Sequence, residues 1–430
     1  MGIDTFTVNI ESLSFGGRGV GRRADGKVVF VPSVIPGEKV RVHSSVEHAS
    51  YILADVDEIL EFSPERVEPR CRVFEACGGC DWQHISYNHQ VMWKKRILAG
   101  EIDKACKSSS LKMLEPVLSE KIYGYRGHAV LQCTYDPDFR MGFFQKKTKR
   151  IVEFDGCPVL NPKIVKILES LREILKRNPV YGLYSLEIHA PQDEVILLAR
   201  CKGKGNVDYS MAMNRIYNQL DVSGVSFMVL GGRRSDHVLG QRFCRYEVPT
   251  RQGVVQLSSG FGGFIQANMK INADLIEYVV HLADGSKKIL DLYSGSGNFS
   301  IPLSYAANEV VAIEKSRRLA SQGKINAKKN GIDNVRFISM DAKKAVVSIQ
   351  NEMLRFDTII LDPPREGARD IVRLLPELKP KRIIYISCDP STLARDLKSL
   401  VKQGYSLRHS RVFDMFPQTY HIETVSYLER

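Results

Sequence analysis

Residues 288–300, KILDLYSGSGNFS, decide the fold of the second half of this chain. Their apolar start predicts a buried strand, and Gly295 and Gly297 predict a tight loop that leads into a helix. Such a loop brings backbone N–H groups close to a nucleotide-like ligand. Ser300 replaces the third glycine of a dinucleotide fingerprint, so the loop disfavours NAD.

Acidic residues follow the next three predicted strands: Glu314, Asp341 and Asp362. Glu314 can accept hydrogen bonds from both ribose hydroxyls of a nucleoside, and Asp341 is suitably placed for the adenine edge. From about residue 269 helices and strands alternate, which predicts a parallel sheet. Four strand ends in this order predict a domain that binds S-adenosylmethionine.

A cysteine lies at a further strand end, in residues 383–396, IIYISCDPSTLARD. Cys388 falls between the apolar run and a helix opened by Pro390, at the edge where parallel sheets bind ligands. A helix N-terminus favours the thiolate, which is a strong nucleophile. A lone cysteine is more often a small buried hydrophobe, but Asp362 and Glu423 stand at neighbouring strand ends. We expect an acid, a thiol and a second acid to face one crevice.

Length and composition set the broad class of protein. The chain has 430 residues, which suggests two or three domains, and a net charge of +12, which favours nucleic acid as partner. No apolar run is long enough for a membrane span, and no signal-peptide pattern is visible, so we expect a cytoplasmic protein. Nine cysteines without a secretory signal favour metal binding or catalysis over disulfides.

The first sixty residues read as short strands with regular turns, the pattern of a small β-barrel. Residues 16–23, GGRGVGRR, form a predicted glycine-rich basic turn, whose arginines can contact phosphate. A solvated basic hairpin is the alternative. The segment resembles a TRAM domain, an OB-like RNA-binding module.

Three cysteines lie within ten residues, at Cys71, Cys77 and Cys80, and Cys157 is a fourth candidate ligand. Four thiolates suit either a [4Fe–4S] cluster or a structural zinc. The spacing matches neither a two-pair zinc ribbon nor the motif of radical enzymes that cleave S-adenosylmethionine. The other cysteines outside the Cys388 turn are interpreted as packing residues: Cys106, Cys133, Cys201 and Cys244.

Residues 242–246, RFCRY, and 261–268, FGGFIQAN, mix aromatic and polar side chains. Such residues can stack on a nucleobase or hydrogen-bond it, although aromatics at this density also occur in ordinary cores.

Assembled in order, these pieces resemble the RNA 5-methyluridine methyltransferase family, in particular its bacterial 23S ribosomal RNA branch with a TRAM domain and an iron–sulfur cluster. The matching pieces are Cys71, Cys77, Cys80 and Cys157, then residues 264–266, 291–299, 362–365, 387–390 and 416–423. One departure is Tyr293-Ser294, where the family often has Phe-Cys.

The resemblance implies a multidomain fold of α/β and β parts. Residues 1–60 are then a TRAM-like OB-fold RNA-binding domain. Residues 61–255 are a central α+β domain with the iron–sulfur cluster. Residues 256–430 are a Rossmann-like S-adenosylmethionine-dependent methyltransferase domain.

It also implies the roles of single residues. Cys388 is the nucleophile and Glu423 the general base, and Cys71, Cys77, Cys80 and Cys157 bind a [4Fe–4S] cluster. The residues that line the cofactor and uracil site are Gln266, Tyr293, Gly295, Asn298, Glu314, Asp341 and Asp362.

The implied reaction is S-adenosylmethionine-dependent methylation of carbon 5 of a uridine in 23S ribosomal RNA, through a covalent Cys388–uracil adduct, by a monomer. One alternative is methylation of a uridine in the T-loop of transfer RNA. Others are an inactive RNA-binding protein that keeps the fold, and methylation of cytosine. Intact Cys388 and Glu423 argue against the inactive protein, and Glu423 favours uracil over cytosine.

Overall fold

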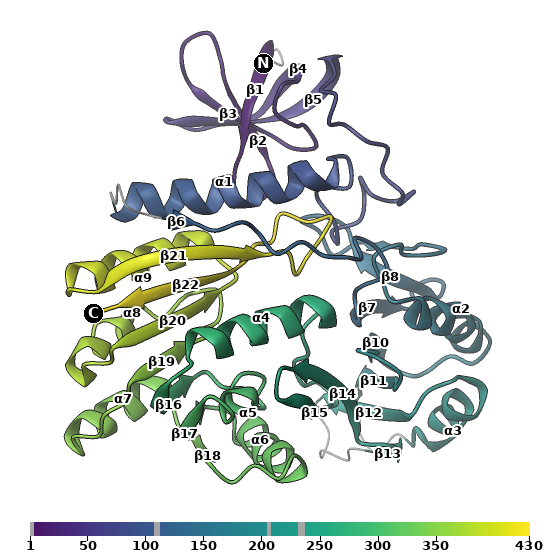
Figure 1. The fold of residues 1–430 in the computed structure, drawn as a ribbon. Coiled ribbons are helices and arrows are strands. Elements are labelled where there is room, and N and C mark those ends of the chain that lie inside the picture. The colour runs from purple at the N-terminus through teal and green to yellow at the C-terminus, as the bar shows by residue number, and fades with distance from the viewer. Residues whose placement is uncertain (1–3, 107–111, 204–207, 231–236) are drawn as a thin grey trace.

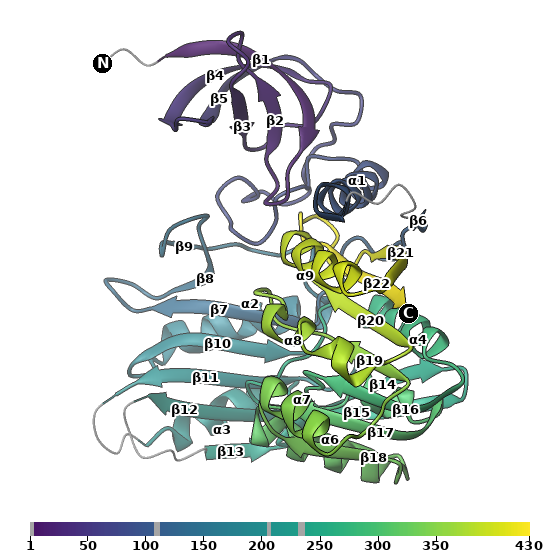
Figure 2. The same cartoon turned by 90° about the vertical axis from the view of Figure 1, so that its left-hand side faces the viewer.

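The computed structural model describes residues 4–106, 112–203, 208–230 and 237–430. Figures 1 and 2 show a barrel at one end of the molecule and, beyond a long helix, two sheets covered by helices. No helix in the described ranges is both long and apolar enough to cross a membrane.

The N-terminal barrel is closed by five strands in the order β1-β2-β3-β5-β4. Alternate apolar side chains such as Val8, Val29 and Val40 fill its interior. Part of the predicted basic turn is strand, because residues 19–22 form β2, and a side chain at Gly21 would clash with the Asn9 carbonyl at 2.3 Å. The strands are β1 (Thr5–Leu13), β2 (Gly19–Arg22), β3 (Val28–Val31), β4 (Lys39–Glu47) and β5 (Tyr51–Glu61).

The long helix α1 (Tyr87–Cys106) and strand β6 (Lys112–Met113) pack with the second half of the chain, although both fall in the range 61–255 assigned to a central domain. Apolar side chains of α1, including Trp93, Leu98 and Ile102, join the same core as Leu393 and Leu397 of α9 (Pro390–Lys402). Strand β6 pairs in parallel with β21 (Ser406–Phe413). The hydrophobic face of α1 is therefore buried on α9.

The central sheet has seven strands in the order β13-β12-β11-β10-β7-β8-β9, with α2 and α3 packed against it (Figure 2). A separate two-stranded ribbon of β14 and β15 follows in the chain. The bounds are β7 (His128–Thr134), β8 (Arg140–Phe144), β9 (Ile151–Val152), α2 (Pro162–Arg177), β10 (Leu183–His189), β11 (Ile196–Lys202), α3 (Ser210–Gln219), β12 (Gly224–Leu230), β13 (His237–Gly240), β14 (Phe243–Thr250) and β15 (Gly253–Gly260).

The last sheet has eight strands in the order β18-β17-β16-β19-β20-β22-β21-β6. Seven run in the same direction, as expected of a parallel sheet, but β22 runs antiparallel to both of its neighbours, β20 and β21. Glu423 therefore begins its strand instead of standing near its end. An antiparallel strand starts at the edge where its parallel neighbours finish, so Glu423 still reaches that edge. The bounds are α4 (Met269–Leu282), β16 (Ser286–Leu292), α5 (Ser300–Leu303), β17 (Ala307–Glu314), α6 (Arg317–Lys329), β18 (Val335–Ser339), α7 (Ala342–Asn351), β19 (Thr358–Leu361), α8 (Arg369–Val372), η1 (Leu375–Leu378), β20 (Arg382–Ser387), α9 (Pro390–Lys402), β21 (Ser406–Phe413) and β22 (Glu423–Glu429).

Candidate active site

Three chemically reactive side chains come from neighbouring strands at one edge of the last sheet. Asp362 directly follows β19, Cys388 directly follows β20, and Glu423 begins β22. The Thr424 hydroxyl donates to the Ser387 carbonyl at 3.1 Å, which fixes β22 beside the Cys388 turn. The structure therefore brings together the acid, the thiol and the second acid, which we call the catalytic edge.

The turn that carries Cys388 is held by the cap of α9. Asp389 is the N-cap, and its Oδ1 accepts hydrogen bonds from the backbone N–H groups of Ser391 at 3.0 Å and Thr392 at 2.9 Å. These are the groups through which a helix N-terminus stabilises a nearby anion. Because Asp389 occupies them, the helix does less for a thiolate than the sequence pattern suggested.

Burial, together with the carboxyls of Glu423 and Asp362, raises the pKa of the Cys388 thiol to about 12. Arg365 opposes them, since its positive charge lowers the thiol pKa. The expectation of a thiolate in the free site is therefore wrong: at neutral pH this sulfur keeps its proton. Desolvation and two acidic neighbours outweigh one arginine and a capped helix.

The two acids of the catalytic edge are shifted toward their protonated forms as well. Burial raises the pKa of Glu423 well above its ordinary range, with the charge of Asp362 adding to the effect. Burial alone raises the pKa of Asp362 to about 7. Pairs of groups shifted this far from solution values are typical of sites that move protons.

The glycine loop after β16 is tied to the end of β17. The backbone N–H of Gly295 donates to Glu314 Oε2 at 3.1 Å, and that of Ser316 donates to Oε1 at 2.7 Å. A Cβ at Gly295 would meet nothing within 4 Å, so open space lies in front of the loop. Tyr293 has φ of 67°, a left-handed conformation that a tyrosine adopts only under constraint. Tyr293, Gly295 and Glu314 thus lie together at one edge of the sheet.

The remaining predicted cofactor residues have structural partners as well. The Asn298 amide exchanges two hydrogen bonds with Asn272 of α4, at 3.0 and 2.9 Å. Asp341 caps α7 by accepting hydrogen bonds from two backbone N–H groups of its first turn. Gln266 is half-buried and lies three residues before α4 begins. The Asn272–Asn298 pair therefore joins the segment that carries Gln266 to the glycine loop.

One charged residue of the glycine-loop region was not assigned a role from the sequence. Asp291 is fully buried in β16, accepts a hydrogen bond from the Ser300 hydroxyl, and burial raises its pKa to about 7. Its Oδ1 and the hydroxyl of Ser294 find no hydrogen-bond partner among the described residues. A carboxylic acid inside an otherwise apolar strand was the signal available in the sequence.

Two family models match the chain. The model of tRNA (Uracil-5-)-methyltransferases covers residues 86–430, and that of the TRAM domain covers residues 3–43. This chain belongs to the RNA uracil-C5 methyltransferase family. The resemblance drawn from its motifs is thereby confirmed, as is the TRAM assignment of the N-terminal barrel.

Relatives of this methyltransferase match it over nearly its whole length. A 23S rRNA (uracil(1939)-C(5))-methyltransferase RlmD of Alkalilimnicola ehrlichii is 34% identical, over 99% of this chain and 97% of the relative. One of the same name from Shewanella sediminis is 32% identical, over 98% and 95%. The solved structure of Pyrococcus abyssi tRNA (uracil-54, C5)-methyltransferase, in complex with S-adenosyl-L-homocysteine, has a TM-score of 0.75 and 26% identity, covering 98% of this chain and 99% of that one.

In this methyltransferase the segment before Glu423, residues 414–422, is held by helix α1; we call it the C-terminal loop. Gln90 and Gln418 exchange two hydrogen bonds, at 3.0 and 2.9 Å. Lys94 Nζ donates to Asp414 Oδ1 at 2.6 Å, and both side chains are fully buried. Removing one partner of such a pair would leave an uncompensated charge, so α1 fixes the start of β22.

The N-terminal barrel also reaches the C-terminal loop. The ring of Phe15 packs edge-on against Tyr420, with centroids 5.6 Å apart, and Trp82 Nε1 donates to the Gly17 carbonyl at 3.3 Å. The backbone N–H of Trp82 donates in turn to the Gln418 carbonyl at 3.0 Å. The barrel's glycine turn is thus part of the support of the catalytic edge, as Figure 1 shows by the closeness of the yellow loop to the N-terminal elements.

The four candidate cysteine ligands line one cavity of about 160 Å³, which we call the cysteine cavity. Its walls include the apolar side chains of Phe74, Val130 and Phe143. Burial, together with the neighbouring thiols, raises the pKa of Cys80 to about 12. The backbone N–H of Gly79 donates to Cys77 Sγ at 3.4 Å, a contact that stabilises a thiolate.

The distances between these sulfurs indicate whether they suit a single metal ion or a larger metal cluster. In the described residues, the one set of three candidate ligands whose atoms all lie within 4.8 Å of one another is His128, Glu187 and His189. No three of the cavity sulfurs are that close. Four thiolates around a single zinc stand about 3.8 Å apart, since each Zn–S bond is about 2.3 Å.

Proposed function

We propose that this methyltransferase transfers a methyl group from S-adenosylmethionine to carbon 5 of one uridine in 23S ribosomal RNA. The target is the uridine equivalent to position 1939 in the names of its full-length relatives. The observation that carries the proposal is the meeting of Asp362, Cys388 and Glu423 at one sheet edge.

The chemistry needs a nucleophile and a base because carbon 5 of uracil is itself a poor nucleophile. Cys388 Sγ adds to carbon 6, and the displaced electron pair forms an enolate across carbon 5, carbon 4 and O4. S-adenosylmethionine supplies an electrophilic methyl on its sulfonium. After carbon 5 has taken the methyl, Glu423 removes the carbon 5 proton, and the bond between carbon 6 and Cys388 breaks.

The raised pKa values set the order of proton movements. Because burial shifts Glu423 toward its protonated form, it can donate to uracil O4 as the enolate forms, and its carboxylate can then accept the carbon 5 proton. Cys388 has to pass its proton to a base when the uracil binds, and Asp362 can accept it, since a pKa of about 7 leaves this carboxyl partly ionised at neutral pH. The charge of Arg365 favours the thiolate that remains. The target base must be unstacked to reach the sulfur, so a loop or a flipped nucleotide is required.

RNA contacts of the barrel are proposed for Arg18 and Arg22 rather than for the whole basic turn. Arg23 is already in ion pairs with Asp4, Asp25 and Glu47. The Arg22 side chain is exposed and donates only to the Gly26 carbonyl among the described residues. Neutralisation of RNA phosphates by such arginines makes binding fall with salt.

We propose further that Cys71, Cys77, Cys80 and Cys157 hold a [4Fe–4S] cluster. The support is the apolar cavity of about 160 Å³ and the spacing of its sulfurs, which is wider than one tetrahedral ion accepts. A cluster there would tie the residue 71–80 segment to Cys157 and so order the RNA-facing side of the central sheet.

Methylation of transfer RNA is the second candidate, favoured by the likeness to the solved tRNA (uracil-54, C5)-methyltransferase. Both substrates are tested together, with labelled S-adenosylmethionine, a 23S fragment around the target and a full set of tRNA transcripts. We expect mass mapping to find 5-methyluridine at a single 23S position with wild type and none with Cys388→Ala. Methylation of the tRNA T-loop with none in the fragment would overturn the ribosomal assignment.

A further inference from the structure

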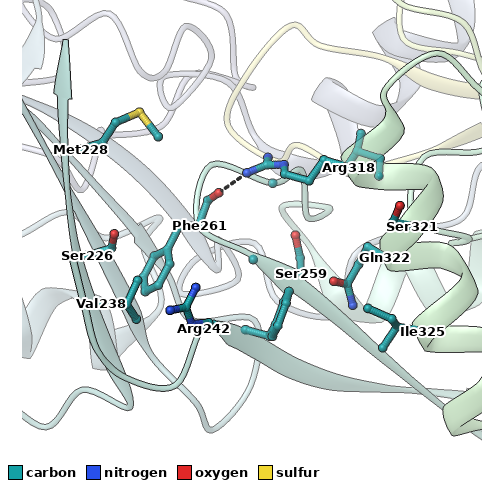
Figure 3. A pocket seen from close by; sticks show the side chains of 14 residues that line it. Ser226, Met228, Val238, Arg242, Ser259, Phe261, Arg318, Ser321, Gln322 and Ile325 are labelled. Carbon is teal, nitrogen blue, oxygen red and sulfur yellow. Dashed lines mark hydrogen bonds between the residues drawn. The ribbon is translucent and has the colours of Figure 1, made fainter. Parts of the chain in front are cut away.

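A second pocket, of about 350 Å³, lies away from the catalytic edge, between β12, the β14–β15 ribbon and α6 (Figure 3). It is lined by the first residues of two aromatic and polar segments, Arg242 and Phe243 of 242–246 and Phe261 and Gly263 of 261–268, which have no role at the catalytic edge. We call it the ribbon pocket.

Two arginines give the ribbon pocket its charge. Arg242 precedes β14, and Arg318 is on the first turn of α6. Arg318 donates to the carbonyls of Phe261 at 2.7 Å and Gly262 at 2.8 Å, so its partners are neutral. Within the described ranges neither arginine takes part in an ion pair, and no carboxylate lines the pocket. A ligand here should therefore be anionic.

The rest of the lining is apolar and aromatic. Phe261 stands between the two arginines in Figure 3, with Met228 and Val238 on the strand side and Ile325 on the helix side. Phe243 is 40% exposed at the rim. Aromatic faces beside guanidinium groups are the combination with which proteins take up unstacked bases of RNA.

We infer that the ribbon pocket binds one unstacked nucleotide of the RNA substrate, with its phosphate between Arg242 and Arg318 and its base on the apolar wall. This inference rests on the proposed function, since it takes RNA to be the substrate. The pocket has room for one nucleotide but not for a base pair. A flexible stretch of RNA next to a flipped target can supply such an unpaired nucleotide.

The pocket is connected to the cofactor side by one short segment. Phe261 and Gly263 line the pocket, and Gln266 follows on the same loop before α4. Arg318 bonds this loop to α6, and α6 begins just after Glu314. A nucleotide held there would therefore set the distance along the RNA from the pocket to the modified uridine.

The test compares Arg242→Ala with Arg177→Ala, a matched loss of one exposed arginine on α2, in the full-length protein. For Arg242→Ala we expect the KM for the 23S fragment to rise about tenfold and the salt slope of binding to fall by about one, with kcat within twofold. Arg177→Ala should leave all three unchanged. Equal behaviour of the two variants would overturn the inference.

Crosslinking locates the nucleotide independently. RNA that carries 4-thiouridine at single positions near the target should crosslink at one position to a peptide containing Met228 or Phe243, and Arg242→Ala should lose that crosslink. Crosslinks that map only elsewhere would contradict the pocket. Uridine monophosphate tests a free nucleotide as occupant: micromolar binding that Arg242→Ala abolishes without changing the RNA KM would also contradict it. Failure of wild type to methylate any RNA would instead reject the proposed function.

Discussion

Two regions of this methyltransferase hold buried thiols, and their neighbours give them different chemistry. The pKa of both Cys388 and Cys80 is raised to about 12, and burial is the largest cause for each. At the catalytic edge the rest of the increase comes from the carboxyls of Glu423 and Asp362, whereas in the cysteine cavity it comes from other thiols. A bound cation can stabilise the thiolates of a group of cysteines. A thiol among acids can instead exchange its proton with them. Burial alone therefore does not tell a ligand from a nucleophile.

Cys388→Ala, which removes the thiol of the catalytic edge, should have the largest effect on activity. We expect methylation to fall by roughly 10⁴-fold or more, since carbon 5 is never activated, and no covalent RNA complex to form. Methyl transfer and denaturing gels measure both effects. Cys106→Ala, which removes a half-buried thiol outside both regions, should retain activity. Residual 5-methyluridine made by Cys388→Ala would show that the nucleophile is misassigned.

Glu423→Gln separates the base from the nucleophile. Gln keeps the size of the side chain but cannot accept the carbon 5 proton, so turnover should fall roughly 10²- to 10⁴-fold. The methylated adduct with Cys388 should persist as a protein–RNA conjugate that depends on S-adenosylmethionine. Glu429→Gln, at the far end of the same strand, is the control. Normal turnover by Glu423→Gln would mean that another base acts.

Cys77→Ser tests the cysteine cavity. Anaerobically purified wild type should be brown, with iron and sulfide in near-equal amounts. The variant should lose most of its iron, and its thermal midpoint should fall by about 5 °C or more, because a bound cluster stabilises only the folded chain. Methyl transfer by the surviving protein should be less affected. Stoichiometric zinc without iron in wild type would reject the cluster.

The comparison extends to Asp291, the buried acid in the strand before the glycine loop, because burial raises its pKa as it raises those of the thiols. The pKa of Asp291 rises from 3.8 to about 7 in the folded chain. Its contribution to stability is therefore complete below its unfolded pKa and is lost as pH rises through about 7. Between pH 5 and pH 8 wild type should lose about 3 kcal/mol of unfolding free energy relative to Asp291→Asn.

Denaturant unfolding of both proteins at the two pH values, without added cofactor, measures this difference. An unchanged gap between wild type and Asp291→Asn would show that the carboxyl ionises inside the sheet. Asp333→Asn, which removes an exposed carboxyl just before β18, serves as the control.

Local patterns in the sequence were enough to predict much of the fold and the catalytic edge. The glycine loop, the turn at Cys388 and the acids after β17 and β19 depend on residues close together in the chain. The direction of β22 was not predictable in this way. The residues around Glu423 would look the same whether the strand ran parallel or antiparallel to its neighbours. The thiolate expectation at Cys388 was wrong because Asp389 occupies the helix N-terminus and two acids approach from other strands.

Contacts between residues far apart in the sequence could not be predicted from sequence patterns. Lys94 reads as an exposed residue of an amphipathic helix, yet it is fully buried on Asp414. Arg23 reads as a phosphate contact, yet it pairs with Asp25 two residues away and with Asp4 and Glu47, which the barrel brings near. In both cases a single sequence shows the charge but not the partner that folding brings to it.

The bond between Gln90 and Gln418 joins residues 328 positions apart. On a ribosome that adds roughly 5 to 20 residues each second, helix α1 emerges tens of seconds before the C-terminal loop that it has to hold. During that interval the apolar side of α1 has no α9 to cover it, and the base Glu423 does not yet exist. The nascent chain can therefore form non-native contacts through α1, and it is unable to methylate RNA. Both periods end when the same C-terminal segment docks.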